Sequence, residues 1–83
     1  MDTTVFEEML AGWPSALVAR TEVETFSGGL MSEKYQSNLD SAGLGPKGRI
    51  RIGRKIAYPV KPYVAWLAAR SSAVKDRDQT IEE

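Results

Sequence analysis

The sequence predicts a small α+β domain that is mostly helical and carries one two-stranded antiparallel β-hairpin. Apolar residues recur at helical steps in several segments, whereas residues 48–60 alternate between apolar and polar, as in a half-buried strand. The 83 residues suffice for one modest core, since so short a chain hides only about 60 to 65% of its unfolded surface. We divide the chain into an N-terminal helix and connector (1–19), a central domain (20–72) and a tail (73–83) in which we expect disorder.

Composition narrows the classes of function. The chain has no cysteine and no histidine, so it lacks the commonest metal ligands and the commonest general base. We therefore expect no enzyme, no catalytic residue, no metal and no cofactor. No apolar run approaches the roughly 20 residues of a membrane span, and the acidic start lacks the basic region of a secretory signal. We expect a cytoplasmic protein without membrane contact.

A first helix is expected near residues 4–11. Thr4 and Glu7 are spaced as in a capping box. Five apolar residues follow at helical spacing and form one face: Val5, Phe6, Met9, Leu10 and Trp13. Pro14 disfavours helical geometry in the residue before it, so residues 14–20 are expected to form a connector.

Two short helices joined by a glycine-containing turn are expected next. Thr21 and Glu24 form a second capping box, and the helix that they open must end at Gly28 and Gly29. Ser32 is a good N-cap for a third helix that runs to about residue 42. This arrangement is typical of a helix-turn-helix.

Within the third helix, Tyr35 and Leu39 share one face because they are four residues apart. We expect both side chains in the core, together with Trp66 and the isoleucines. The remaining face is rich in hydrogen-bonding groups and is expected to be open to solvent.

From residue 48 onward the pattern predicts a hairpin. Arg49 and Arg51 are expected to point outward and Ile50 and Ile52 inward. A two-residue turn at residues 53–54 would split the apolar residues between two faces, whereas a three-residue loop (53–55) pairs Ile52 with Ile56 and Ile50 with Tyr58. We therefore expect the three-residue loop.

A fourth helix is expected to begin near Pro62, which is tolerated in a first turn. It should end near Arg70 or Ser72. Its apolar face comprises Tyr63, Val64, Trp66 and Leu67, with Arg70 at the negative end of the helix dipole.

Charge is unevenly distributed in this chain of zero net charge. Residues 47–61 contain no acidic residue but hold Lys47, Arg49, Arg51, Arg54, Lys55 and Lys61. The order helix, turn, helix, basic hairpin, helix is that of a winged helix-turn-helix domain, whose recognition helix enters the major groove of DNA. The hairpin of such a domain would contact phosphates or the minor groove. Expected DNA contacts of the recognition helix are Ser32, Glu33, Lys34, Gln36, Ser37 and Asn38. Expected contacts of the wing are Lys47, Arg49, Arg51, Arg54 and Lys55.

Residues 20–70 resemble the AlpA-like and excisionase-like regulators of phages and mobile elements. The matching residues are Ser32, Gly43, Pro46, the run RIGRK at 51–55, Val64, Trp66 and Leu67. The turn after Gly28 is longer than in that family, and Gln36 replaces an often apolar residue. The resemblance implies a small transcriptional regulator or an excisionase-like architectural factor that binds duplex DNA, sometimes beside an integrase.

Other interpretations stay open. The polar face of the third helix could be plain solvated surface, and the basic hairpin could protect a sheet edge against aggregation. The alternative function is protein–protein interaction, through the apolar face of the first helix if that helix does not pack on the core. The expected partner is double-stranded DNA, with an integrase or a second copy of the chain as further candidates.

Overall fold

The protein is an α+β domain with four α-helices and a three-stranded antiparallel sheet in the part described here, residues 4–71 of a computed structural model. The elements in chain order are α1 (Thr4–Gly12), β1 (Leu17–Ala19), the 3-10 turn η1 (Arg20–Glu22), α2 (Val23–Phe26), α3 (Glu33–Ser41), β2 (Ile50–Ile52), β3 (Lys55–Pro59) and α4 (Val60–Ala69). The predicted α+β class is confirmed. The expected disorder of the tail lies outside the described residues.

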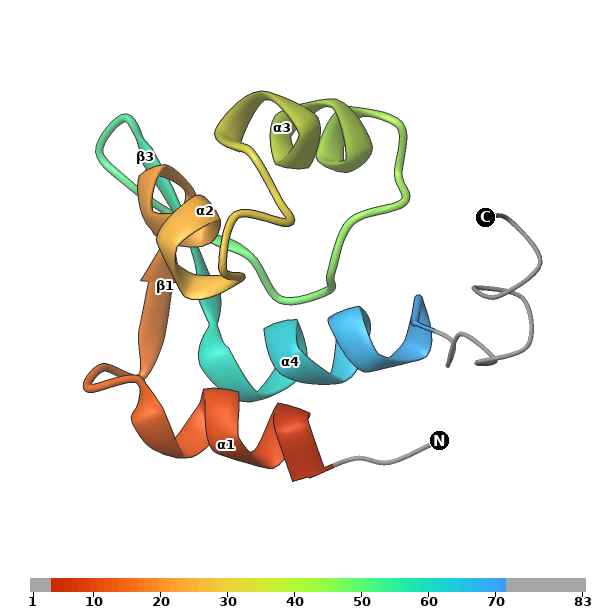
Figure 1. Cartoon of the computed structure of the whole chain (residues 1–83). Helices are drawn as coiled ribbons and strands as arrows, with labels where there is room; N and C mark the ends of the chain where they lie inside the picture. Colours follow the sequence, from red (N-terminus) through yellow and green to blue (C-terminus); the bar gives the residue numbers. More distant parts are fainter. Residues whose placement is uncertain (1–3, 72–83) are drawn as a thin grey trace, which may run out of the picture.

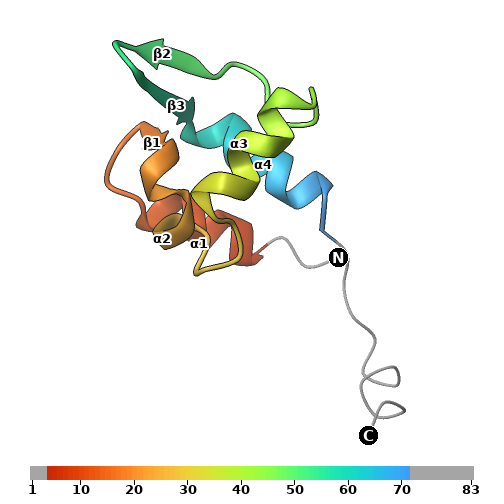
Figure 2. The ribbon, with the colours of Figure 1, turned by 90° about the horizontal axis from the view of Figure 1, so that it is seen from above.

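The helices form two levels with the sheet along one side. In Figure 1, α1 and α4 lie side by side at the bottom of the molecule, whereas α3 and the tip of the β2–β3 hairpin lie at the top. Seen from above in Figure 2, the hairpin projects beyond α2 and α3. No helix among the described residues is long and apolar enough to cross a membrane.

The sheet has one strand more than the sequence predicts. Its order is β1-β3-β2, so the segment expected as a connector supplies the edge strand β1. Val18 pairs with Tyr58 and Ala19 with Ala57. Three residues are too few to show a strand period in the sequence, and pairing with β3 supplies the hydrogen bonds that make the segment a strand.

The predicted register of the hairpin is wrong. Ile52 pairs with Lys55, and Arg51 pairs with Ile56, so a two-residue turn at Gly53 and Arg54 joins the strands. Gly53 has a positive φ of 63° whereas Arg54 does not, as in the tight hairpin turn that favours glycine at its first central position. Turn chemistry therefore outweighs the apolar alternation on which the prediction rested.

The new register reverses the faces of β2. Residues that pair directly lie on one face of a sheet, so Arg51 shares a face with Ile56 and Tyr58, and Ile50 and Ile52 lie on the opposite face. Because the hairpin extends past the core, all three residues of β2 are exposed. The expectation that Ile50 and Ile52 lie in the core is wrong: they are 39% and 61% exposed.

The helix boundaries largely follow the sequence. The Ser32 hydroxyl caps α3 by accepting a hydrogen bond from the Tyr35 backbone N–H at 3.0 Å, as predicted. α4 ends at Ala69 with Arg70 as its C-cap, close to the predicted end, but it begins at Val60, two residues before the predicted start at Pro62. The predicted cap at Thr21 is wrong, because the turn begins one residue earlier, at Arg20, and no side chain caps η1 or α2.

The core lies between the two helical levels and the sheet. Its buried apolar residues are Val18, Val23, Phe26, Met31, Leu39, Tyr58, Val60, Tyr63 and Val64. Four residues of α1 and its C-terminal flank pack against it: Phe6, Met9, Leu10 and Trp13. The Trp13 and Phe26 rings meet edge to face, 5.0 Å apart. The first helix thus packs on the core with four of the five residues of its predicted apolar face, whereas the fifth, Val5, is 55% exposed.

The turn geometry makes a testable prediction. Gly53→Ala forces a side chain into a positive φ and should lower the free energy of unfolding by roughly 1 kcal/mol, measured by urea denaturation. Gly12→Ala is the matched control, because an added Cβ at this residue of α1 meets nothing within 4 Å. It should be neutral or stabilising. Equal effects of the two substitutions would contradict the two-residue turn.

Candidate nucleic-acid interface

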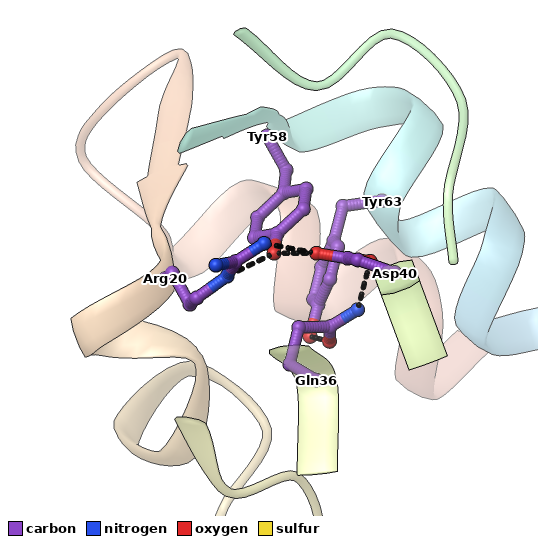
Figure 3. A network of polar contacts seen from close by, with 5 residues as sticks. All are labelled: Arg20, Gln36, Asp40, Tyr58 and Tyr63. Atoms are coloured by element: carbon purple, nitrogen blue, oxygen red, sulfur yellow. Dashed lines mark hydrogen bonds and ion pairs between the residues drawn. The ribbon is translucent and has the colours of Figure 1, made fainter. Parts of the chain in front are cut away.

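A buried polar network fixes α3 to the rest of the domain (Figure 3). The Asp40 carboxylate is its centre: Oδ2 accepts hydrogen bonds from Arg20 Nη2 at 2.6 Å and from the Tyr58 hydroxyl. Oδ1 accepts from Gln36 Nε2 at 3.3 Å. The Gln36 amide oxygen in turn accepts from the Tyr63 hydroxyl at 2.7 Å. The network joins α3 to η1, β3 and α4.

This network sets the rotation of α3 about its axis. The buried face consists of Gln36, Leu39 and Asp40, whereas Tyr35 is 45% exposed. The prediction of Leu39 in the core is confirmed and that of Tyr35 is wrong. The apolar pattern failed because two of the three buried side chains are polar and satisfy each other.

Gln36 is therefore not an exposed reader of DNA. Its side chain is fully buried, and both ends of its amide are engaged inside the protein. The prediction that it lies on the open side of the helix is wrong. The spacing of Gln36 and Asp40, four residues apart on one helix, was a signal for this pairing, because glutamine and aspartate at that spacing bond to each other.

The chain after α3 closes over the same carboxylate. A Cβ built on Gly45 would lie 1.9 Å from Asp40 Oδ1 and 3.2 Å from the Asp40 Cα. Only a residue without a side chain allows this approach, since the carboxylate cannot move without leaving the network. Gly45 thus helps to enclose Asp40.

The network and its burial raise the pKa values of its two tyrosines. Burial, followed by the hydrogen bond to Asp40, raises the pKa of Tyr58 to about 12 against the opposing effect of Arg20. Burial also raises the pKa of Tyr63 well above its usual range. Burial lowers the pKa of Arg20, but its hydrogen bonds with Tyr58 and Asp40 outweigh that effect and leave the pKa raised. The tyrosines therefore stay neutral and Arg20 stays charged at neutral pH.

Above the network, two adjoining hollows bring α3 and the hairpin together. One is lined by Arg20, Glu33, Lys34, Ser37 and Asn38. The other is lined by Ala19, Arg20, Thr21, Glu33, Arg54, Lys55 and Ile56. Because Arg20 and Glu33 line both, we treat them as one feature and call it the α3–hairpin groove.

The groove unites part of the expected site. Glu33, Lys34, Ser37 and Asn38 come from the exposed side of α3, and Arg54 and Lys55 from the hairpin tip. Arg51 does not line the groove but shares a sheet face with Ile56, which does. Lys47 and Arg49 are exposed on the segment leading into β2 and do not line it, and Ser32 serves as the N-cap of α3.

Charge in the groove is mixed but mainly positive. Four cationic side chains line it, Arg20, Lys34, Arg54 and Lys55, against the single carboxylate of Glu33. Asp40 lies beneath and is paired with Arg20. The groove can therefore attract a polyanion, and the lone carboxylate can accept a hydrogen bond from a neutral donor.

Sequence reasoning missed Arg20, which belongs to both hollows and to the network. Nothing in its immediate sequence marks it, because its partners Asp40 and Tyr58 are distant in the chain. No cluster of three or more potential metal ligands occurs among the described residues. No family model matches the chain, and no curated protein or solved structure matches it either.

The raised pKa of Tyr58 predicts a loss of stability in alkali. An unfolded tyrosine ionises near pH 10, whereas Tyr58 in the folded protein does so near 12. Its contribution is complete below pH 10 and is lost as pH rises from 10 to 12, by up to roughly 3 kcal/mol. Urea denaturation at pH 9, 10.5 and 12 should show a smaller fall in Tyr58→Phe than in the wild type. Tyr35→Phe, which changes an exposed tyrosine, should lose as much free energy of unfolding in alkali as the wild type does. If Tyr58→Phe also loses as much as the wild type, the stabilising role of the neutral Tyr58 hydroxyl is refuted.

Proposed function

We propose that the protein is a winged helix-turn-helix domain that binds duplex DNA in a sequence-dependent manner through the α3–hairpin groove. The observation that carries the proposal is that polar residues of α3 and basic residues of the hairpin tip line adjoining hollows. If these side chains were scattered over the molecule, one duplex could not contact both groups. In this proposal α3 is the recognition helix and the β2–β3 hairpin is the wing.

The exposed side of α3 suits the major groove. Lysine can donate to the guanine edge and asparagine can pair with the adenine edge, and Lys34 and Asn38 stand one turn apart on the open side of the helix. Ser37 lies between them and can donate or accept. The buried network keeps α3 from rotating, so these side chains are presented in one orientation.

Glu33 favours base recognition over plain phosphate binding. A carboxylate in the groove repels phosphates, but it can accept a hydrogen bond from the amino group of cytosine. Because Glu33 lines both hollows, it lies where the two halves of the interface meet. We assign it to sequence discrimination.

The hairpin supplies the electrostatic anchor. Arg54 and Lys55 are exposed at its tip, and neither forms an ion pair within the described part of the chain. Free cations of this kind release counterions when they meet phosphates, which makes binding strong at low salt and weak at high salt. The resemblance to AlpA-like and excisionase-like regulators supports the same assignment and favours a regulatory or DNA-architectural role.

The proposal predicts two distinct effects of mutation. Arg54→Ala with Lys55→Ala should weaken binding to all duplexes and reduce the slope of log K against log salt by about 1 to 2. Asn38→Ala should instead relax sequence preference at a cost of roughly 1 to 3 kcal/mol. Fluorescence anisotropy with a selected duplex and its scrambled version, at two salt concentrations, separates the effects.

Lys61→Ala is the matched control for charge, because Lys61 is exposed on α4 and does not line the groove. It should change neither the slope nor the preference. If it changes the slope by as much for each charge removed as the hairpin variant does, binding follows overall charge and the groove is not the interface.

Protein–protein interaction is a second candidate, favoured by one observation. An apolar hollow lies between α1, the turn after α2 and the end of α4, lined by residues that include Phe6, Met9, Met31 and Leu67. At its rim Val5 is 55% exposed and Leu30 is 84% exposed. Such exposed apolar surface is typical of a contact with another protein chain.

The two candidates respond differently to Leu30→Ser. If the groove binds DNA, this variant keeps the duplex affinity and salt dependence of the wild type. If the apolar hollow forms a contact between copies of the chain, sedimentation equilibrium shows a salt-insensitive dimer in the wild type and a monomer in the variant. Loss of duplex binding in Leu30→Ser would contradict the placement of DNA in the groove.

A further inference from the structure

Arg20 stands apart from the other cations of the groove because its guanidinium is held in place by the protein. Nε donates to the Tyr58 hydroxyl at 2.9 Å, and Nη2 donates to Asp40 Oδ2 at 2.6 Å. Both bonds use one edge of the planar group. Side chains of lysine and arginine on a surface normally sample many rotamers, whereas this one has its orientation fixed.

The other edge of the guanidinium is available. A guanidinium has five N–H donors, and the two hydrogen bonds above use one on Nε and one on Nη2. The Nη1 group has no hydrogen-bonding partner within residues 4–71. In Figure 3 this nitrogen is turned away from Asp40, and 21% of the Arg20 side chain is exposed.

The location of Arg20 is central. It lines the hollow beside α3 and the hollow beside the hairpin, so a ligand that touches both elements passes over it. Its fixed donors require an acceptor that presents oxygen atoms at the surface without reaching deep into the protein. A backbone phosphate has this geometry, and arginine binds phosphate oxygens through paired N–H groups.

We propose that Arg20 is the phosphate-binding residue at the centre of the α3–hairpin groove, oriented for this contact by Asp40 and Tyr58. The inference rests on the proposed DNA-binding function and adds a site to it. Because the side chain is ordered before binding, less rotamer entropy is lost than for a mobile lysine. The contact then fixes the register of α3 in the DNA groove, since phosphate contacts position a protein on the duplex.

The test must separate a phosphate contact from the structural role of Arg20. Arg20→Met alone would leave Asp40 buried and unpaired, which destabilises a protein. The informative variant is therefore Arg20→Met with Asp40→Asn, which removes both charges together. Asp40→Asn alone is the reference for the double variant, because it keeps the arginine cation while it removes the ion pair that orients it. Arg54→Ala reports on the wing independently.

Anisotropy with a random-sequence duplex across a salt series gives the result. We expect the double variant to have a slope of log K against log salt that is lower by about 0.9, the value for one phosphate contact, than the slope of Asp40→Asn. A folded double variant with the same slope as Asp40→Asn overturns the role of Arg20, while the loss of slope in Arg54→Ala still supports the groove. Absence of duplex binding by the wild type overturns the proposed function and this inference with it.

A second measurement uses the wild-type protein and therefore tests the contact even if the double variant does not fold. In wild-type protein labelled with nitrogen-15, the Nη resonances of Arg20 should shift when duplex DNA is added at low salt. Those of Arg70, whose guanidinium lies over the Trp66 ring 5.1 Å from its centroid, serve as the reference outside the groove. Unchanged Arg20 resonances at saturating DNA overturn the contact.

Discussion

The arrangement of this domain depends on the burial of one carboxylate. Asp40 is 4% exposed, and a carboxylate removed from water must be compensated by cations or by hydrogen bonds. Arg20, Tyr58 and Gln36 provide that compensation. Each comes from a different part of the chain or a different turn of helix, so satisfying the carboxylate requires η1, β3 and α3 to meet in one geometry. No buried side-chain polar atom among the described residues is left without a partner.

Such a network is better explained by specificity than by stability. Replacing a buried ion pair with apolar side chains is often neutral or stabilising, so Asp40 and Arg20 need not add net free energy. A core built from few large apolar residues allows a short helix to pack in more than one rotation, because several faces would bury similar area. The polar network admits only the rotation in which Gln36 and Asp40 face inward, and this rotation places Lys34, Ser37 and Asn38 on the groove. The network that fixes the packing of α3 therefore also determines which of its side chains are available for the proposed function.

The sequence predicts the elements better than it predicts their contacts. Capping and glycine signals located α3 within one residue of its observed start, because the Ser32 cap is a local interaction. The hairpin register was missed, since the prediction weighed the alternation of isoleucines above the preference of Gly53 for a tight turn. β1 was missed because three residues carry no readable period. The two errors differ in cause: β1 depends on pairing with the distant strand β3, which its own three residues do not reveal, whereas the turn at Gly53 is a local signal that the prediction weighed too little.

The candidate site was also predicted only in part. Six residues were named from their polarity and line the groove: Glu33, Lys34, Ser37, Asn38, Arg54 and Lys55. Gln36 has the same polarity and is buried, while Arg20 was not named and lies at the centre. Polarity alone cannot distinguish a side chain that satisfies a buried partner from one that faces solvent, because both are hydrogen-bonding groups on an otherwise amphipathic helix. The distinction follows from the burial of the Asp40 carboxylate. Gln36 turns inward because its amide donates to Asp40 Oδ1. Arg20 lies between the core and the groove, with one edge of its guanidinium bonded to the protein and the other edge free. Arg20 thus both compensates the buried carboxylate and lines the groove, so a single hydrogen-bonded side chain links Asp40 to the groove surface.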